Sequence, residues 1–215
     1  MFVQGQAGRL NCLTYYSYSD MLSCRKGGCW KKLMQKRETA IPDVFLIEPK
    51  VFRDERGFFL ESYQAQKYSV LGIPHTFVQD NFAGSRQGVL RGLHYQIRNP
   101  QGKLVQVTHG EVFDVVVDLR RSSAHFGKWV GVLLKAGDHS LLWVPPGFAH
   151  GYYVLSGWAE VFYKVTDWYA PEWERTLLWN DPALGIRWPL LEGTTPIVSA
   201  KDADGKNLSD AESFA

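Results

Sequence analysis

The 215-residue sequence has no long apolar run, almost no net charge and few cysteines. A bilayer-spanning helix needs about 20 consecutive apolar residues, so we expect no membrane partner. The 24 basic and 22 acidic residues leave a formal charge of +2. Because no long basic run gathers these charges, we expect no nucleic-acid partner. All cysteines (Cys12, Cys24 and Cys29) lie near the N-terminus, which argues against a disulfide scaffold and favours a cytoplasmic location.

The sequence divides near residue 36 into two unequal parts. Residues 1–36 show no sustained apolar period, so we expect a disordered or peripheral extension, with a native start near Met34. An ordered arm that packs on a partner is the alternative. Residues 37–215 hold enough apolar and aromatic side chains for one core, and we predict one domain that ends in an irregular, partly helical segment.

Short apolar runs separated by turn residues fill the sequence from residue 41 to about residue 170. Gly, Pro, Asn and Asp lie between the runs, and no regular alternation of helices and strands is evident. The predicted strands are at 58–63, 77–82, 89–96, 104–107, 111–118, 128–134, 140–144, 151–155 and 159–166. This pattern predicts an all-β, antiparallel jelly-roll barrel with short peripheral helices.

Two histidines lie in runs that are typical of the two motifs of a cupin barrel. His94 follows Gly88 by six residues, and His150 ends a Pro-x-Gly-x-x-His run. A metal-binding cupin places a second histidine two residues after the first, but here that position is Gln96. We therefore predict a barrel pocket without a bound metal, in which His94 can move protons.

Cationic and phenolic side chains accompany His94. Lys103 begins the next strand-like segment, and inward-facing side chains of alternate positions fill a small barrel. Arg56 and Arg91 could bind an anionic ligand with their guanidinium groups, although Arg56 also fits a solvated turn. Tyr163 lies on a strand of alternating character and either packs in the core or, if it faces His94, donates a proton.

The chain is similar to the family of dTDP-4-dehydrorhamnose 3,5-epimerases from about residue 39 to about residue 202. The motifs that carry the resemblance are at 54–59, 78–81, 88–96, 101–105, 110–115, 147–151, 163–164, 169–172 and 179–183. The resemblance implies a jelly-roll homodimer that acts without a cofactor on a dTDP-4-keto-6-deoxy sugar. The implied reaction converts dTDP-4-dehydro-6-deoxy-D-glucose to dTDP-4-dehydro-L-rhamnose by inverting C3 and C5.

The resemblance also implies catalytic roles for four residues. His94 is the base that removes the proton beside the ketone, and Asp202 pairs with it, with Asp204 as the alternative partner. Lys103 holds the enolate oxygen, and Tyr163 returns a proton from the opposite face. The implied substrate-binding residues are Arg56, Glu61, Gln79, Asn81, Arg91, His150 and Tyr169, of which the two arginines resemble diphosphate contacts.

Three other functions fit part of the pattern. They are a single-carbon epimerase, a metal-dependent cupin oxygenase or isomerase, and a non-catalytic sugar-nucleotide-binding module. Gln96 argues against the metal enzyme because it occupies the place of a ligand. The joint presence of His94, Lys103 and Tyr163 argues against the binding module, since binding alone needs neither a base nor an acid.

Overall fold

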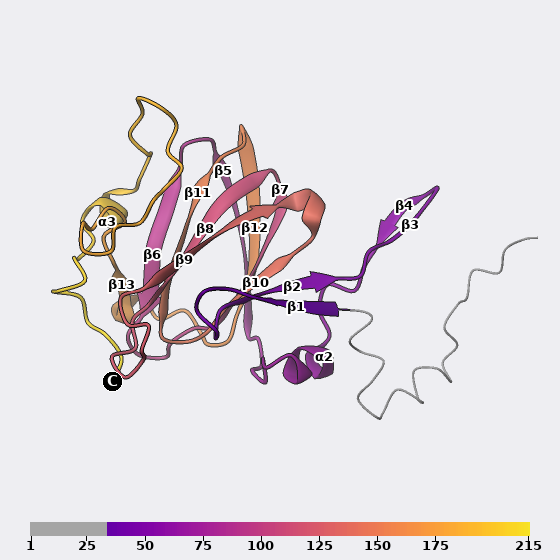
Figure 1. The fold of residues 1–215 in the computed structure, drawn as a ribbon, viewed down its shortest axis with the longest axis horizontal. Helices are drawn as coiled ribbons and strands as arrows, with labels where there is room; N and C mark the ends of the chain where they lie inside the picture. The colour runs from indigo at the N-terminus through magenta and orange to yellow at the C-terminus, as the bar shows by residue number, and fades with distance from the viewer. Residues whose placement is uncertain (1–33) are drawn as a thin grey trace, which may run out of the picture.

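The computed structural model describes residues 34–215, which form mostly antiparallel strands (Figure 1). The strands are β1 Met34–Glu38, β2 Phe45–Pro49, β3 Phe52–Asp54, β4 Gly57–Phe59, β5 Gln79–Arg86, β6 Leu90–Gln96, β7 Lys103–His109, β8 Glu111–Asp118, β9 Trp129–Lys135, β10 Leu141–Val144, β11 Phe148–Val154, β12 Trp158–Val165 and β13 Glu174–Thr176. The helices are α2 Ala65–Val70 and α3 Ala200–Ala203, with single 3-10 turns η3 Ala136–Asp138 and η4 Pro171–Trp173. The predicted all-β class with short peripheral helices is confirmed.

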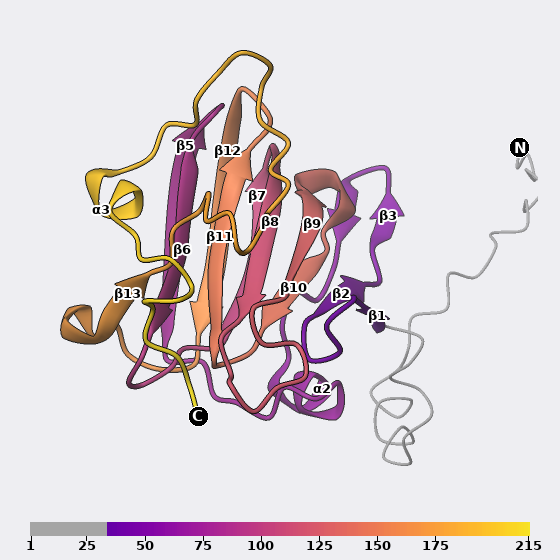
Figure 2. The same ribbon diagram turned by 60° about the vertical axis from the view of Figure 1, so that its left-hand side comes forward.

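Two antiparallel sheets face each other and form the body of the jelly roll (Figure 2). Among the described residues, the first sheet has the strand order β1-β2-β10-β7-β12-β5 and the second has the order β13-β6-β11-β8-β9. Neighbouring strands such as β7 and β12 are far apart in the sequence. The interior is therefore lined by strands that are neighbours in space but distant in the sequence.

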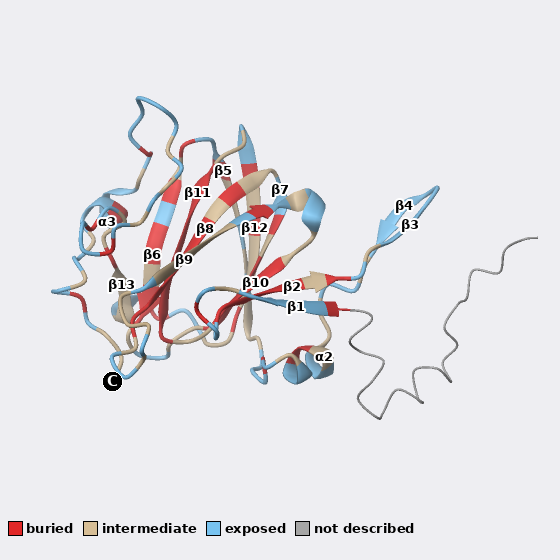
Figure 3. Cartoon of the chain, viewed as in Figure 1, coloured by how far each residue is buried: buried red, intermediate tan, exposed pale blue. Residues whose placement is uncertain are grey.

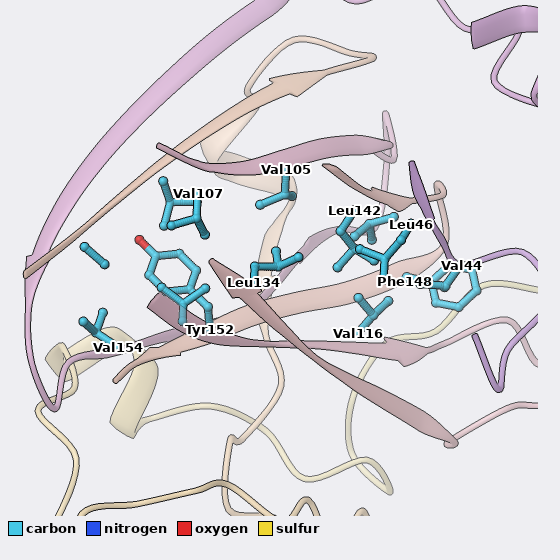
Figure 4. Close-up of a cluster of buried hydrophobic side chains, with 14 of the residues drawn as sticks. Val44, Leu46, Val105, Val107, Val116, Leu134, Leu142, Phe148, Tyr152 and Val154 are labelled. Carbon is cyan, nitrogen blue, oxygen red and sulfur yellow. The ribbon is translucent and has the colours of Figure 1, made fainter. Parts of the chain in front are cut away.

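The space between the sheets is filled by apolar side chains from both of them (Figure 4). Strand side chains alternate between the two faces of a sheet, so β7 directs Val105 and Val107 inward while β8 directs Val112 and Val116 toward them. Full burial of one such side chain contributes about 2 kcal/mol. Because a slip of one residue would move every one of them outward, this core also determines which polar side chains face the interior.

Strands β3 and β4 form a separate hairpin that projects from the barrel (Figures 1 and 3). The apolar run at 58–63 predicts a strand, but the observed strand β4 ends at Phe59 and belongs to this hairpin. Its aromatic side chains are exposed, with 57% of Phe58 and 70% of Phe59 accessible to solvent. The apolar run therefore does not mark a core strand: Phe58 and Phe59 stay exposed on the hairpin, and Tyr63, which lies beyond β4, is the residue that packs on the core cluster around Phe45 and Trp143.

The predicted extension at 1–36 falls mostly outside the described residues. Its last three residues, 34–36, belong to β1, which pairs antiparallel with β2 from Met34 to Glu38. The predicted boundary at residue 36 thus falls inside this strand, because an edge strand needs no apolar period of its own: the pattern of β1 is one buried residue followed by exposed ones. Within the described part of the chain, the helices are too short or too polar to traverse a bilayer.

Strands β6 and β11 approach closely at Gly151, where their register shifts between His150 and Tyr152. A Cβ atom at Gly151 would lie 2.5 Å from the carbonyl oxygen of Arg91 and 3.0 Å from Cα of Gly92. Both neighbours are backbone atoms, so they can yield only if the two strands separate. Glycine is thus required here by a close approach of two main chains.

We predict that Gly151→Ala lowers the free energy of unfolding by about 2 kcal/mol, the usual cost of overpacking. Urea denaturation monitored by tryptophan fluorescence measures this effect. Gly157→Ala is the matched control, because a Cβ atom at Gly157 would meet nothing within 4 Å. Equal stability of the two variants would contradict the prediction.

Candidate active site

A cavity of about 340 Å³ opens between the two sheets and collects most of the predicted site residues. Strand alternation places many of these residues, because each of the strands β5, β6, β7, β11 and β12 directs alternate side chains inward. The lining residues are Gln79, Asn81, Ala83, Arg91, His94, Tyr95, Gln96, Gln101, Lys103, His150, Gly151, Tyr152, Tyr163, Tyr169, Glu174 and Lys201.

His94 lies on β6 and is held by Asp202, a buried residue of α3. Nε2 of His94 lies 2.6 Å from Oδ1 of Asp202, and the backbone N–H of Gly92 donates to Oδ2 at 3.3 Å. A carboxylate only accepts, so Nε2 carries the hydrogen and Nδ1 is the nitrogen that can take up a proton. Burial works to raise the pKa of Asp202, but the hydrogen bonds from His94 and Gly92 outweigh it and the pKa is lowered.

Asp202, rather than the alternative Asp204, is the residue in contact with His94. The N-cap residue Ser199 accepts a hydrogen bond from the backbone N–H of Asp202 at 3.1 Å, which fixes the first turn of α3. Asp204 follows at the C-cap and its side chain is exposed. The helix therefore orients one carboxylate toward the cavity and the other toward solvent.

Lys103 begins β7 on the opposite sheet and is buried. Its Nζ donates to the backbone carbonyl oxygen of His94 at 3.2 Å. Burial lowers the pKa of Lys103 to about 8, although the nearby carboxylates of Glu174 and Asp114 act to raise it. The ammonium group thus sits next to His94 in a poorly solvated interior, where it interacts strongly with any developing negative charge.

Tyr163 lies on β12, beside β7 in the same sheet as Lys103. Burial raises the pKa of Tyr163, and the charge of Arg91 offsets part of this increase. The phenol therefore keeps its proton near neutral pH. Its neighbour Lys164 points the other way and pairs with Asp80 at 2.8 Å, so Tyr163 is the inward-facing residue of the two.

The remaining cavity residues surround this centre. Arg91 donates from Nε to Oγ of Ser85 at 2.9 Å, and Gln79 donates to Oδ1 of Asn81 at 2.9 Å. Tyr169 is about half exposed, and its hydroxyl donates to Oε2 of Glu174 at 2.9 Å. These groups form a polar rim around the imidazole of His94, the buried ammonium group of Lys103 and the phenol of Tyr163.

His150 lies on β11, next to β6, and is buried against Asp114 of β8. Nε2 of His150 lies 2.9 Å from each carboxylate oxygen of Asp114. The cavity therefore holds two histidines from one sheet, each paired through Nε2 with a buried aspartate. The sequence motif pointed to His150, but nothing in it pointed to Asp114.

Arg56 and Glu61 lie outside this cavity. Arg56 is at the tip of the β3–β4 hairpin and pairs with Asp54 at 2.5 Å, while Glu61 pairs with Lys67 of α2 at 2.6 Å. The hairpin and α3 lie on opposite sides of the protomer in both ribbon views (Figures 1 and 2). Within one protomer, the structure does not bring these two predicted residues to the others.

Glu174 and Lys201 line the cavity but were not predicted. They form an ion pair of 2.8 Å, and hydrogen bonds from Lys201 and Tyr169 outweigh burial and lower the pKa of Glu174. Glu174 lies on a three-residue strand, β13, that no periodicity reveals. The only signal for Lys201 was its position next to Asp202.

Gln96, which occupies a ligand position of metal-binding cupins, makes structural hydrogen bonds. Its Nε2 donates to the carbonyl oxygens of Asn99 and Trp168, and its Oε1 accepts from the backbone N–H of Ala170. The amide therefore ties β6 to the chain segments that carry Tyr169. Among residues 34–215, no three His, Cys, Asp or Glu side chains gather as a metal site.

Comparison with known proteins gives consistent matches over the same region. Residues 38–210 match the family model of dTDP-4-dehydrorhamnose 3,5-epimerase. The chain is 56% identical over 182 residues to the protein of that name from Pseudomonas aeruginosa PAO1, covering 84% of this chain and 99% of the relative. It is 54% identical to the Salmonella typhimurium LT2 protein, covering 81% of this chain and 95% of that one.

A solved structure has a similar fold. The dTDP-6-deoxy-D-glucose-3,5-epimerase of Legionella pneumophila Philadelphia 1, in complex with dTDP-4-keto-L-rhamnose, superposes with a TM-score of 0.80 at 52% sequence identity. The match covers 83% of this chain and 95% of the Legionella chain.

We predict that Lys103→Met stabilises the protein, because the buried ammonium group disfavours the folded state. The pKa of Lys103 is about 8 in the folded protein, against 10.5 for an unperturbed lysine, so the unfolded chain binds more protons between these pH values. Wild-type stability should therefore rise from pH 8 to pH 10.5, and the variant should lose this rise. At pH 7 the gain is at most about 3 kcal/mol.

Urea denaturation at pH 7 and pH 10 measures both effects, provided that each variant is compared with wild type in the same buffer. Lys164→Met is the control, since Lys164 pairs with Asp80 on the outer face of the same sheet. A Lys103→Met variant that is less stable than wild type at pH 7 would refute the prediction.

Proposed function

The chain belongs to the dTDP-4-dehydrorhamnose 3,5-epimerase family, and we propose that it epimerises dTDP-4-dehydro-6-deoxy-D-glucose at C3 and C5 to give dTDP-4-dehydro-L-rhamnose. One observation carries the proposal: an oriented imidazole on one sheet meets an ammonium group and a phenol from the other sheet at a single cavity. Proton removal next to a ketone, followed by reprotonation, needs these three groups.

In the first step, Nδ1 of His94 takes the proton from a carbon next to the ketone. The electrons of the broken C–H bond form a C=C bond, and the carbonyl electrons move onto the oxygen to give an enolate. An imidazole is a weak base for such a carbon, so the oxyanion must be stabilised. The ammonium group of Lys103 can contribute about 3 kcal/mol to this, the scale of one oxyanion-hole donor.

In the second step, the phenol of Tyr163 gives its proton to the same carbon from the opposite face, and the configuration inverts. The raised pKa of Tyr163 keeps the phenol protonated until the enolate forms. The proton taken by His94 then returns to the tyrosinate through solvent. No electrons leave the substrate, so the reaction consumes no oxidant or reductant.

Both carbons can be served by one base and one acid. In a gluco-configured chair, the hydrogens on C3 and C5 are axial and point to the same face of the ring. A base below the ring therefore meets either hydrogen after a small shift of the sugar. We propose that Arg91 binds the diphosphate, that Gln79 and Asn81 contact the nucleotide, and that the exposed ring of Tyr169 stacks on the base.

We further propose that the protein acts as a homodimer in which Arg56 and Glu61 bind the substrate held by the partner subunit. The supporting observation is the exposed β3–β4 hairpin with its uncovered Phe58 and Phe59. Such aromatic surface favours burial against another chain. An arginine at the tip of a projecting hairpin can reach a diphosphate that lies outside its own protomer.

Incubation of the wild-type protein with the 4-keto sugar nucleotide in deuterium oxide tests the proposed function. We predict deuterium at C3 and C5 of the product, measured by NMR. His94→Ala should lower exchange at both carbons by at least about 1,000-fold, because it removes the base. Lys164→Met serves as the control and should exchange like wild type. Uptake at one carbon only would indicate a single-carbon epimerase, and uptake by His94→Ala at the wild-type rate would overturn the role of His94.

Mixed dimers test the shared site. We predict that His94→Ala and Arg56→Ala subunits, each inactive alone, regain activity when they are dissociated and reassembled together. In a heterodimer, the Arg56→Ala subunit keeps His94 and receives the intact hairpin of its partner, so one of the two cavities is complete. Random reassembly should restore about a quarter of the wild-type sites. If the hairpin served its own protomer, mixing would restore nothing, and a monomer in sedimentation analysis would also refute the proposal.

A further inference from the structure

Two histidines that line the cavity are each paired with a buried aspartate, and the proposed mechanism uses only one of these pairs as a base. His94 and His150 lie opposite each other in the register of β6 and β11. Each ring binds its aspartate through Nε2, so Nδ1 is the nitrogen that remains for a ligand in both. The pairs look alike, but the surroundings of their carboxylates differ.

The carboxylate of Asp202 is stabilised by two separate donors. Nε2 of His94 lies 2.6 Å from Oδ1, and the backbone N–H of Gly92 donates to Oδ2 at 3.3 Å. Each oxygen therefore has its own hydrogen bond. Because each oxygen has its own donor, this geometry suits an ionised Asp202 beside a neutral His94, and the pKa of Asp202 is lowered although burial acts to raise it. A neutral His94 is what a base requires.

The carboxylate of Asp114 has a poorer environment. It is 0% exposed, and both of its oxygens converge on the single Nε2 of His150 at 2.9 Å. Within residues 34–215, no other donor makes a hydrogen bond to it. An ionised carboxylate without further donors is very costly to bury, and such a group acquires a proton or a charged partner instead.

Lys103 does not fill this place. Its charge acts on Asp114 from nearby, since Asp114 raises the pKa of Lys103, but its Nζ donates to the carbonyl oxygen of His94. The other ionisable groups that line the cavity are Arg91, His94 and Tyr95 on β6, Tyr152 on β11, Tyr163 on β12, Tyr169, Glu174 on β13 and Lys201 on α3. None of them makes a hydrogen bond to Asp114 in the described part of the chain.

We propose that the Asp114–His150 pair holds one more proton than the His94–Asp202 pair, so that Nδ1–H of His150 donates a hydrogen bond into the cavity. The site of the extra proton does not change this result. An imidazolium carries hydrogen on both nitrogens, and a protonated carboxyl donates to Nε2, which leaves the hydrogen of the neutral imidazole on Nδ1. Asp114 is then a positioning residue that acts through His150. The inference rests on the proposed function, in which the acceptor is the enolate oxygen beside Lys103.

Two similar pairs in different environments thereby acquire opposite tasks. His94 accepts a proton from carbon, whereas His150 keeps its proton and donates a hydrogen bond to the oxygen that becomes negative. No bond to hydrogen breaks at His150, so the balance of the two-step reaction is unchanged. In general, two side chains of the same type can act as acid and as base in one site when their environments give them different proton affinities.

The charge state of His150 can be measured in the wild-type protein without any substrate. We propose long-range proton–nitrogen NMR of the imidazoles at pH 7, with His150→Asn and His94→Asn used to assign the signals. A protonated Nδ1 at His150 together with an unprotonated Nδ1 at His94 is the expected result. An unprotonated Nδ1 at His150 would overturn the inference, whatever the enzyme activity.

Kinetics of Asp114→Asn test the link to catalysis. The amide keeps the shape of the side chain but cannot stabilise the extra proton, so we expect kcat to fall about 100-fold with little change in KM, the pattern for a contact made only in the transition state. Asp118→Asn is the matched control, because Asp118 is a buried carboxylate on the same strand that pairs with Arg120 away from the cavity.

The outcomes separate this inference from the proposed function. If wild type shows no deuterium exchange, the proposed function fails, and the NMR result still decides the proton count of the pair. If wild type exchanges and Asp114→Asn keeps its kcat, the inference alone fails. If Asp114→Asn does not fold, the NMR measurement on wild type decides.

Discussion

The hydrogen bond between His94 and Asp202 is the contact on which the site depends. It joins β6 to α3 across more than a hundred residues of sequence, and it leaves Nδ1 of His94 as the nitrogen that can accept a proton. Without the carboxylate, the imidazole could rotate or adopt the other tautomer. The rest of the cavity is arranged relative to this one oriented nitrogen, with Lys103 bonded to the backbone of the same residue.

Much of the fold could be predicted because strand patterning is a local property. β8 was predicted at 111–118 and observed as Glu111–Asp118, since its buried side chains recur with the period of a strand. Edge and isolated elements were harder. β1 exposes most of its residues, and the hairpin that contains Phe58 and Phe59 is apolar but faces solvent. β1 has a paired strand on one side only and the hairpin pairs only with itself, and no local sequence signal reports which neighbours a strand will have.

The site residues could be predicted where a motif, or the alternation of side chains along a strand, determines which way a side chain points. His94, Lys103 and Tyr163 lie on regular strands, so a residue's parity along the strand decides whether it faces the cavity. Parity also places Asp114 on the inward face of β8, but it does not identify partners, which come from other parts of the chain: His150 on β11 for Asp114, and Lys201 on α3 for Glu174. Pairing across a sandwich is a property of topology, and a single sequence carries little information about it.

The low dielectric constant of the interior makes it costly to bury a charge, but it also strengthens the interaction of that charge with other charges. Burial lowers the pKa of Lys103 to about 8, which means that the folded protein gives up stability to keep this ammonium group in the cavity. In return, an ion in such a place interacts with a developing oxyanion far more strongly than it could in water. A buried cation next to an oriented imidazole is therefore unfavourable for folding alone. The reaction that we propose accounts for its position, because the enolate would supply the negative partner that the folded protein leaves incomplete.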